Sequence, residues 1–230
     1  MQKRRRHAKT PAMFKLVVFD CDGTLVDSQV RIVEAMKMAF AERGHKLAEP
    51  AAVRGAVGLS LPDFVARLLP GHDRDEHAAT AELYRQAFFT MRMQGLHEEP
   101  MYPGAKSALD EIRASGCDMG IATGKSRRGL AAVLDRHALH GHFITLQTAD
   151  TNAGKPDPEM LLKAMDEAGA LPAETVMIGD TSFDMEMARN AGVAGIGVGW
   201  GYHEPAELTD AGAMAVAGSF DELPALLRGR

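Results

Sequence analysis

The sequence predicts a protein of the α/β class, in which a core built on a parallel sheet carries a separate helical segment inserted after the first strand. Two patterns lead to this prediction. Short apolar runs alternate with helical patterns along most of the chain, which is typical of parallel strands joined by crossover helices. One long stretch, residues 29–99, breaks this alternation because it contains no convincing strand. An apolar content of 46% over 230 residues suffices for a substantial core.

Six apolar runs have the length and composition of buried strands. They are residues 16–19, 119–122, 143–146, 176–178, 196–198 and 214–217. Helical patterns between and after them cover residues 105–114, 127–137, 158–168, 183–190 and 221–227. Ser126, Asp157 and Ser182 are residue types that favour the N-cap position, and each stands just before one of these helices.

The inserted stretch has apolar residues at helical spacing on two faces. The first face holds Ile32, Met36, Ala39 and Phe40, and the second holds Tyr84, Ala87, Phe88 and Met91. We therefore expect a core domain of residues 13–28 and 100–230, a helical domain of residues 29–99, and hinges near Ser28 and Pro100. Residues 1–12 contain a basic run and are expected to form a disordered arm.

Composition excludes several classes of protein. A net charge of −5 argues against a nucleic-acid-binding surface. The two cysteines, Cys21 and Cys117, are far apart and exclude a disulfide scaffold and a zinc site. No apolar stretch approaches the roughly 20 residues of a membrane span, and no apolar signal-peptide core follows the basic run. We therefore expect a cytoplasmic protein that binds neither nucleic acid nor membranes.

An acidic pair closes the first apolar run. Asp20 and Asp22 follow residues 16–19 directly, and Gly23-Thr24 after them signals a turn. Open parallel sheets bind their ligands at the carboxyl ends of the strands. Two carboxylates at one sheet edge are costly unless a cation or a substrate compensates their charge. The pair is therefore a candidate functional site.

The decapeptide Phe19-Asp20-Cys21-Asp22-Gly23-Thr24-Leu25-Val26-Asp27-Ser28 resembles the first motif of the haloacid dehalogenase (HAD) superfamily of phosphotransferases. The resemblance implies the HAD fold, a Rossmann-like parallel sheet core with an inserted α-helical cap domain. It also implies that Asp20 is a nucleophile that forms an aspartyl phosphate, and that Asp22 is first general acid and then general base. Because the dehalogenases and the ion-pumping ATPases of the superfamily lack the second acid, Asp22 favours hydrolysis or transfer of phosphate esters.

Three further motifs follow in the family's order. Thr123-Gly124 ends the second apolar run, and a hydroxyl with the backbone N–H groups of a helix start suits phosphate oxygens. Gly154-Lys155-Pro156-Asp157-Pro158 resembles the third motif, which implies that Lys155 neutralises Asp20 and the transferring phosphoryl group.

The fourth motif is Gly179-Asp180-Thr181-Ser182-Phe183-Asp184. Carboxylate and carbonyl oxygens suit a hard cation such as Mg²⁺. The resemblance implies that Mg²⁺ is held by Asp20, the carbonyl oxygen of Asp22, and Asp180. It implies that Asp184 either orients Lys155 or binds metal-ligated water.

Among family members, the motifs resemble those of phosphoglycolate phosphatase-like hydrolases. This implies a Mg²⁺-dependent phosphatase for a small phosphorylated metabolite, with 2-phosphoglycolate as the named candidate, acting as a monomer or a homodimer. A sugar phosphomutase of the β-phosphoglucomutase type is the alternative, because it uses the same two aspartates. A catalytically idle binding protein is the third hypothesis, but it would have lost a motif Asp or Lys, and none is lost.

Substrate specificity is expected to come from the cap. Arg54, in a glycine-rich stretch, is the candidate for pairing with an anionic group on the leaving portion of the substrate. The other interpretation of Arg54 is a solvated surface residue. The spacing between Arg54 and Ser60-Leu61 does not match the Arg-x-x-Ser-Leu loop of the mutases.

Overall fold

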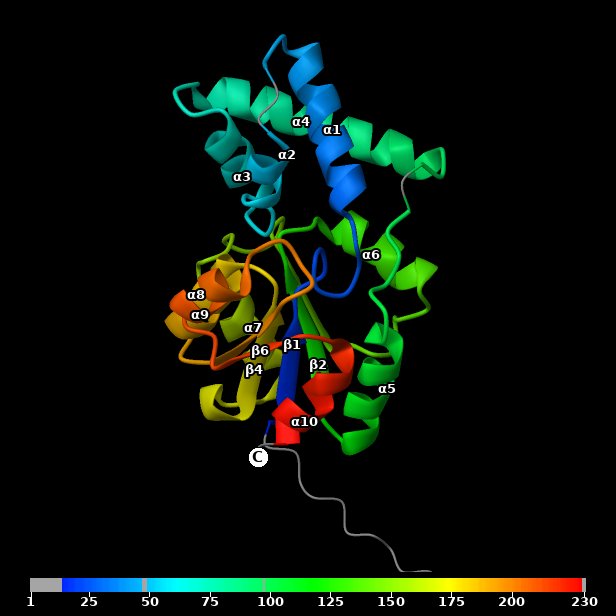
Figure 1. The fold of residues 1–230 in the computed structure, drawn as a ribbon, viewed down its shortest axis with the longest axis vertical. Coiled ribbons are helices and arrows are strands. Elements are labelled where there is room, and N and C mark those ends of the chain that lie inside the picture. Colours follow the sequence, from blue (N-terminus) through cyan, green and yellow to red (C-terminus); the bar gives the residue numbers. More distant parts are fainter. Residues whose placement is uncertain (1–13, 47–48, 97, 229–230) are drawn as a thin grey trace, which may run out of the picture.

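The computed structural model describes residues 14–46, 49–96 and 98–228. Within them, six strands form one parallel sheet in the order β3-β2-β1-β4-β5-β6 (Figure 1). Along the chain they are β1 (Leu16–Phe19), β2 (Asp118–Thr123), β3 (Thr145–Thr148), β4 (Thr175–Gly179), β5 (Ala194–Val198) and β6 (Ala215–Ala217). The Rossmann-like α/β core that the sequence predicts is confirmed.

The central strand β1 is buried along its whole length. Val17 pairs with Met119 of β2 on one side and with Val176 of β4 on the other. Successive residues of a strand point to opposite faces of the sheet. Val17 therefore packs into one core cluster, whereas Leu16 and Val18 pack into the other. Both faces of the sheet are covered at β1, and this is why the sequence of the strand is an unbroken apolar run.

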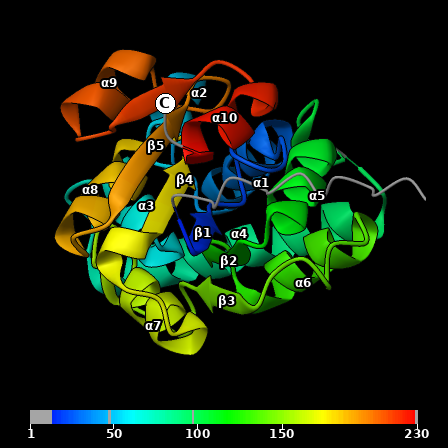
Figure 2. The same cartoon turned by 90° about the horizontal axis from the view of Figure 1, so that it is seen from below.

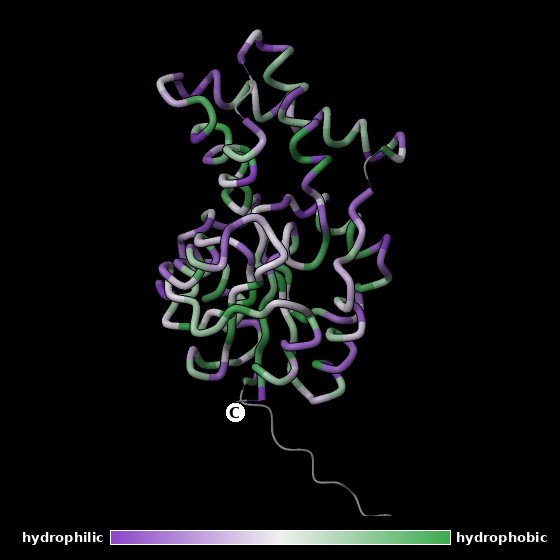
Figure 3. The backbone as a smooth tube through the Cα atoms, viewed as in Figure 1, coloured by the Kyte–Doolittle hydropathy of each residue, from purple (hydrophilic) through white to green (hydrophobic). Residues whose placement is uncertain are grey.

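Helices cover both faces of the sheet. The helices α5 (Ala105–Ser115), α6 (Arg127–Arg136) and α10 (Leu223–Arg228) contribute to one apolar cluster, and α7 (Glu159–Ala168) and α8 (Ser182–Asn190) contribute to the other. Seen from below in Figure 2, α5 and α10 lie on one side of the sheet and α7 and α8 on the opposite side. The hydrophobic segments accordingly concentrate in the strands and on the inward faces of these helices (Figure 3).

The edge strand β3 starts two residues later than the sequence predicts. Phe143 is buried in the core before the strand begins, whereas Ile144 is 54% exposed. Pairing with β2 sets the register, since Thr145 lies opposite Gly120. Because β3 is an edge strand, it pairs on one side only and includes buried polar residues such as Thr148. The apolar run at residues 143–146 therefore does not mark the position of the strand.

Several helix boundaries also differ from the prediction. The cap of α8 is Thr181 rather than Ser182, because Thr181 Oγ1 accepts from the backbone N–H of Asp184 while the Asp184 carboxylate accepts from Thr181 N. The predicted helix 221–227 is a 3₁₀ turn, η2 (Phe220–Glu222), that continues into α10. Two short elements were not predicted, the 3₁₀ turn η1 (Pro172–Glu174) and the helix α9 (Pro205–Asp210).

Four helices, here called the cap helices, stand above the carboxyl edge of the sheet in Figure 1. They are α1 (Gln29–Glu42), α2 (Pro50–Arg54), α3 (Leu61–Leu68) and α4 (Arg74–Met93). Among the described residues between 29 and 99 the chain forms helices and turns but no strand. Met36, Phe40 and Phe64 belong to an apolar cluster of the cap helices that is distinct from the two clusters of the sheet.

The two chain segments that connect the cap helices with the core run side by side. Asp27 N donates to Pro100 O at 2.9 Å, and Tyr102 N donates to Leu25 O at 3.0 Å. Val26 and Met101 form an antiparallel bridge between these two bonds. The two linkers are therefore hydrogen-bonded to each other at the point where the chain leaves the core and later returns to it.

The expected basic arm of residues 1–12 lies outside the described residues. Of the helices in the part of the chain that the structure describes, none is both long enough and apolar enough to span a bilayer.

Truncation of a core leucine tests the packing of α5 against the sheet. Leu109 is fully buried, so Leu109→Ala should lower the free energy of unfolding by about 2–5 kcal/mol, through lost apolar contact and a residual cavity. Leu162→Ala is the control, because Leu162 is 50% exposed on α7 and should cost less than about 0.5 kcal/mol. Urea unfolding measures both, and equal losses would contradict this description of the core.

Candidate active site

Asp20, Thr123 and Asp180 lie where three neighbouring strands end at the same edge of the sheet. Asp20 follows β1, Thr123 is the last residue of β2, and Asp180 follows β4. The strand order reverses direction between β1 and β4. Open α/β sheets bind their ligands in the crevice beyond the carboxyl ends of the strands at such a reversal.

Lys155 joins Asp20 and Asp184. Its Nζ lies 2.9 Å from Asp20 Oδ1 and 2.6 Å from Asp184 Oδ1, and each of the three side chains is at most 1% exposed. Burial by itself lowers the pKa of Lys155, but the charges of Asp184 and Asp20 outweigh it and raise that pKa above its usual value. The ammonium group is therefore a fixed positive charge beside Asp20.

Asp180 is held through both of its oxygens. Thr24 Oγ1 donates to Oδ1 at 2.7 Å, and the backbone N–H of Tyr202 donates to Oδ2 at 3.0 Å. Gly23 and Gly201 make room for the carboxylate, because a Cβ at either position would collide with the Asp180 side chain. Gly23 also has a φ of +84°, which glycine adopts without strain.

Asp184 contacts Lys155 and caps its own helix. Its Oδ2 accepts from Thr181 N at 3.0 Å and from Thr181 Oγ1 at 2.7 Å, while its Oδ1 accepts from Lys155 Nζ. Gly179 leaves room for the Asp184 side chain, since a Cβ at position 179 would collide with it. The fold of the β4–α8 turn thus fixes the orientation of the lysine.

Three buried carboxylates face one ammonium group at this edge. Asp20, Asp180 and Asp184 each offer an oxygen, and these oxygens lie within 4.8 Å of one another. Burial raises the pKa of Asp20 to about 7, against the opposing charge of Lys155. Burial, with the charges of Asp20 and Asp184, raises the pKa of Asp180 well above its usual value. The excess of negative charge and the all-oxygen donor set fit a hard divalent cation such as Mg²⁺.

Asp22 projects from the turn after β1 with one oxygen anchored. Its Oδ1 accepts from Ser28 Oγ and from Lys125 Nζ, the latter at 2.6 Å. These two donors on Oδ1 leave Oδ2 as the oxygen available to a bound group.

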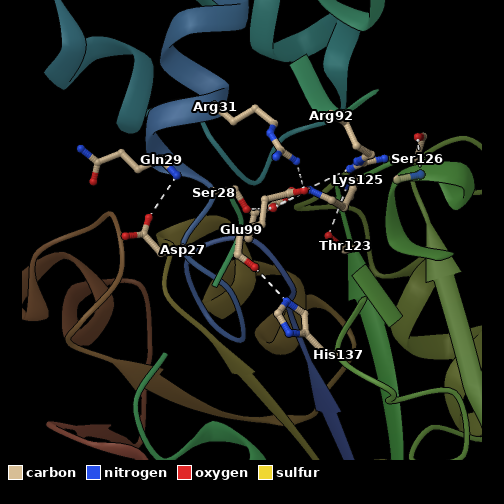
Figure 4. A network of polar contacts seen from close by, with 12 residues as sticks. Asp27, Ser28, Gln29, Arg31, Arg92, Glu99, Thr123, Lys125, Ser126 and His137 are labelled. Carbon is tan, nitrogen blue, oxygen red and sulfur yellow. Dashed lines mark hydrogen bonds and ion pairs between the residues drawn. The ribbon is translucent and has the colours of Figure 1, made fainter. Parts of the chain in front are cut away.

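Lys125 is a site residue that sequence analysis missed. Besides Asp22, its Nζ reaches Glu99 Oε1 at 3.0 Å. Glu99, in the segment that returns from the cap helices to the core, also pairs with Arg31 of α1 and Arg92 of α4 (Figure 4). Burial lowers the pKa of Lys125, but the charges of Asp22 and Glu99 raise it above its usual value. The adjacent Thr123-Gly124 was the sequence signal that could have found it.

The Thr123-Gly124 turn lies directly under the loop between α2 and α3. Thr123 Oγ1 accepts from the backbone N–H of Lys125 at 3.2 Å. A Cβ on Gly124 would lie 2.5 Å from Leu59 O and 2.8 Å from Gly58 O. Glycine at this position therefore allows the cap backbone to approach the core backbone closely.

A cavity of about 350 Å³ separates the strand ends from the cap helices. Its polar end is formed by Asp20, Asp22, Thr123 and Gly124. Lys155 is not among the lining residues and lies buried behind Asp20. The cap helices and the loop before α3 contribute mostly apolar side chains, among them Ile32, Val57, Leu59, Leu61, Phe64, Tyr84, Phe88 and Phe89.

Arg54 is not brought to this cavity. The residue ends α2, is half-buried and is not among the residues that line the cavity. The glycine-rich stretch does reach the cavity, but through Val57, Gly58 and Leu59 rather than through Arg54.

Two other conspicuous residues serve packing. Trp200 stacks on Phe220 with 4.5 Å between ring centroids and donates to Thr24 O at 3.1 Å. Cys21 is buried, and burial raises the pKa of its thiol. The thiol is therefore not a nucleophile at neutral pH.

Comparison with known proteins identifies the family. The family profile described as "Haloacid dehalogenase-like hydrolase" matches residues 17–198. The chain belongs to this family. The resemblance recognised from the four motifs is thereby confirmed.

Relatives and solved structures support the same family. The chain is 36% identical over 214 residues to a protein of Dickeya dadantii named "Probable phosphatase IndB", covering 92% of each chain. It is 33% identical to the phosphoglycolate phosphatase of Pseudomonas savastanoi pv. phaseolicola, over 94% of this chain and 79% of the relative. A solved hydrolase structure from Pseudomonas syringae, 28% identical, superimposes with a TM-score of 0.80 over 92% of this chain and 97% of the other.

The raised pKa of Asp20 predicts a pH-dependent stability. The carboxyl titrates near 4 when unfolded and at about 7 when folded. Between these values the folded state holds the extra proton, so the free energy of unfolding falls as pH rises. In chelator, Asp20→Asn should therefore exceed wild type in stability by about 2–4 kcal/mol at pH 8, and this gap should close below about pH 4.

Urea unfolding at both pH values measures this gap, and added Mg²⁺ should narrow it at pH 8. Asp210→Asn, which changes an exposed carboxylate on α9, is the control and should leave the stability unchanged. A gap that is the same at pH 4 and pH 8 would contradict the raised pKa.

Proposed function

We propose that this hydrolase is a Mg²⁺-dependent phosphatase that cleaves a small phosphomonoester through an aspartyl phosphate. The observation that carries the proposal is the buried Asp20, which contacts Lys155 at 2.9 Å, lies in a carboxylate cluster and faces a cavity. A carboxylate in this setting can act as a nucleophile toward phosphorus, because the adjacent ammonium group stabilises the negative charge on the phosphoryl group during its transfer.

The phosphate would lie at the polar end of the cavity. The Thr123 hydroxyl and the backbone N–H groups after it, near the start of α6, would bind its oxygens. Lys155, behind Asp20, would offset the negative charges of the carboxylate and the phosphoryl group as they approach.

The reaction would run in two steps, formation and hydrolysis of the aspartyl phosphate. In the first, an Asp20 oxygen bonds to phosphorus, the ester P–O bond breaks, and the alcohol oxygen takes a proton from Asp22. In the second, a water oxygen bonds to phosphorus, its proton returns to Asp22, and the P–O bond to Asp20 breaks to release inorganic phosphate. The free Oδ2 of Asp22 suits this proton exchange, because Ser28 and Lys125 hold Oδ1.

Mg²⁺ would be held by Asp20, the carbonyl oxygen of Asp22, and Asp180, with Asp184 beside them. When bound, it would supply positive charge against the phosphate oxygens. Thr24 and the backbone N–H of Tyr202 orient Asp180 for this role. We further propose that residues 29–99 act as a cap domain on a core of residues 13–28 and 100–230.

The substrate would be a small phosphorylated metabolite. 2-Phosphoglycolate is the first compound to test, since several relatives carry the name phosphoglycolate phosphatase. Transfer to water rather than to a sugar predicts stoichiometric release of inorganic phosphate without activation by a sugar bisphosphate. We expect a cytoplasmic monomer or homodimer that acts without nucleic acid or membrane.

Replacement of the proposed nucleophile tests the mechanism. Asp20→Asn should lower kcat for any phosphate ester by at least about 10³-fold, because an amide cannot form an acyl phosphate. The Asp118→Asn variant is the matched control, since Asp118 begins β2 at the opposite edge of the sheet and should leave kcat unchanged. Circular dichroism checks the fold of both variants. Wild-type turnover by Asp20→Asn would exclude Asp20 as the nucleophile.

Metal dependence is tested by chelation and by one ligand variant. Activity should vanish in chelator and return with Mg²⁺, and Asp180→Asn should raise the Mg²⁺ concentration for half-maximal activity by at least about tenfold. Activity titrations against Mg²⁺ measure both effects. Full activity after exhaustive chelation would refute the proposed metal role.

A further inference from the structure

Beyond its catalytic end, the cavity is walled by aromatic rings of the cap helices. Phe64 of α3 and Tyr84, Phe88 and Phe89 of α4 all line it. The ring centroids of Phe64 and Tyr84 lie 6.0 Å apart at an interplanar angle of 83°, and those of Tyr84 and Phe88 lie 5.8 Å apart at 39°. The rings of Phe64, Tyr84 and Phe88 therefore contact one another, and together with the neighbouring Phe89 they are here called the aromatic wall.

Most cations around the cavity already pair with protein carboxylates. Lys125 and Arg92 both contact the buried Glu99, at 3.0 Å and 3.2 Å. Arg85 pairs with Glu82 at 3.0 Å. The charges of Lys125 and Arg92 are therefore used to offset a buried carboxylate of the protein.

Lys125 and Arg92 also lie over a ring, 5.1 Å and 5.3 Å from the centroid of Phe88. Arg128 differs from them in that no carboxylate among the described residues pairs with it. Its Cζ lies 4.0 Å from the ring centroid of Phe89, which is 38% exposed. A guanidinium group stacked on a ring presents a flat surface. Arg128 therefore extends the aromatic wall toward solvent.

We propose that the physiological substrate is a phosphate monoester whose alcohol half is uncharged and carries a ring. This proposal rests on the phosphatase function above, because Asp20 and Thr123 take the phosphate in both. The ring would then lie against Tyr84 and Phe89, in the part of the cavity that continues from the phosphate end. Apolar rings gain free energy on leaving water and pack edge-to-face or offset against other rings.

Size and charge both disfavour glycolate as the preferred alcohol half. A cavity of about 350 Å³ lies within the range of roughly 300–1,000 Å³ that holds ligands much larger than a two-carbon acid. Glycolate would leave the aromatic wall in contact with water, and Lys125 and Arg92 near the phosphate end already pair with Glu99.

A set of three esters tests the proposal: 2-phenylethyl phosphate, ethyl phosphate and 2-phosphoglycolate. The first two differ by the ring while the ester carbon and its leaving oxygen are alike. We expect kcat/KM for 2-phenylethyl phosphate to exceed that for ethyl phosphate by about 10- to 100-fold, and to exceed that for 2-phosphoglycolate as well.

Variants of the wall assign this preference to its residues. Phe89→Ala and Tyr84→Ala should each lower the ratio of kcat/KM between 2-phenylethyl and ethyl phosphate by at least about threefold. A general loss of folding or of catalysis changes both rates and leaves the ratio unchanged. Phe89→Ala is the safer variant, because its side chain is partly exposed. Met93→Ala removes a 70% exposed side chain from the same helix and is the control that should leave both rates unchanged.

The outcomes separate the two proposals. A ring preference that the wall variants reduce supports the ring-bearing substrate. Equal rates for the phenylethyl and ethyl esters, or a higher rate for 2-phosphoglycolate, would overturn it while leaving the phosphatase function in place. Failure to hydrolyse any of the three esters with Mg²⁺ would overturn both.

Discussion

The ion pairs that Lys155 makes with Asp20 and Asp184 are the interaction on which the site depends. The ammonium group lies within 3 Å of both buried carboxylates and offsets part of the cost of burying their charges. The pairs require β1 and β4 to be neighbours, since Asp20 follows one strand and Asp184 lies in the first turn of the helix after the other. They also require the Thr181 cap, which fixes Asp184. Sheet topology, helix capping and the reactivity of Asp20 are thus parts of one arrangement.

The cap helices are joined to this arrangement at a few closely packed points. Gly124 of the core lies against the backbone of Gly58 and Leu59, and Gly154 lies against Ser60. Beside these backbone contacts, Glu99 pairs with Arg31, Arg92 and Lys125 and so connects α1, α4 and the core loop after β2. Lys125 in turn reaches Asp22. The position of the cap is therefore coupled physically to the residue proposed as acid and base.

Core and cap contribute different information about function. The core residues recur as the four motifs by which the family is recognised, and in the proposed mechanism they bind phosphate and metal whatever the substrate is. The cavity surface made by α3 and α4 is aromatic and apolar, and its Arg85 and Arg92 pair with Glu82 and Glu99. The family relationship therefore supports the reaction, whereas the wall of the cavity bears on the alcohol half of the substrate.

The sequence by itself determined the α/β core, the strand that carries Asp20 and the meeting of Asp20, Lys155 and Asp180. The first two follow from local apolar runs, and the third follows from the resemblance of the motifs to those of the family. The start of β3, the capping by Thr181 and the place of Arg54 outside the cavity were decided by tertiary structure. So were the contacts of Lys125 with Asp22 and Glu99 and the aromatic wall, because they join residues from separate helices and loops. Periodicity shows which face of a helix is apolar, but only packing decides whether that face covers a core or lines a cavity.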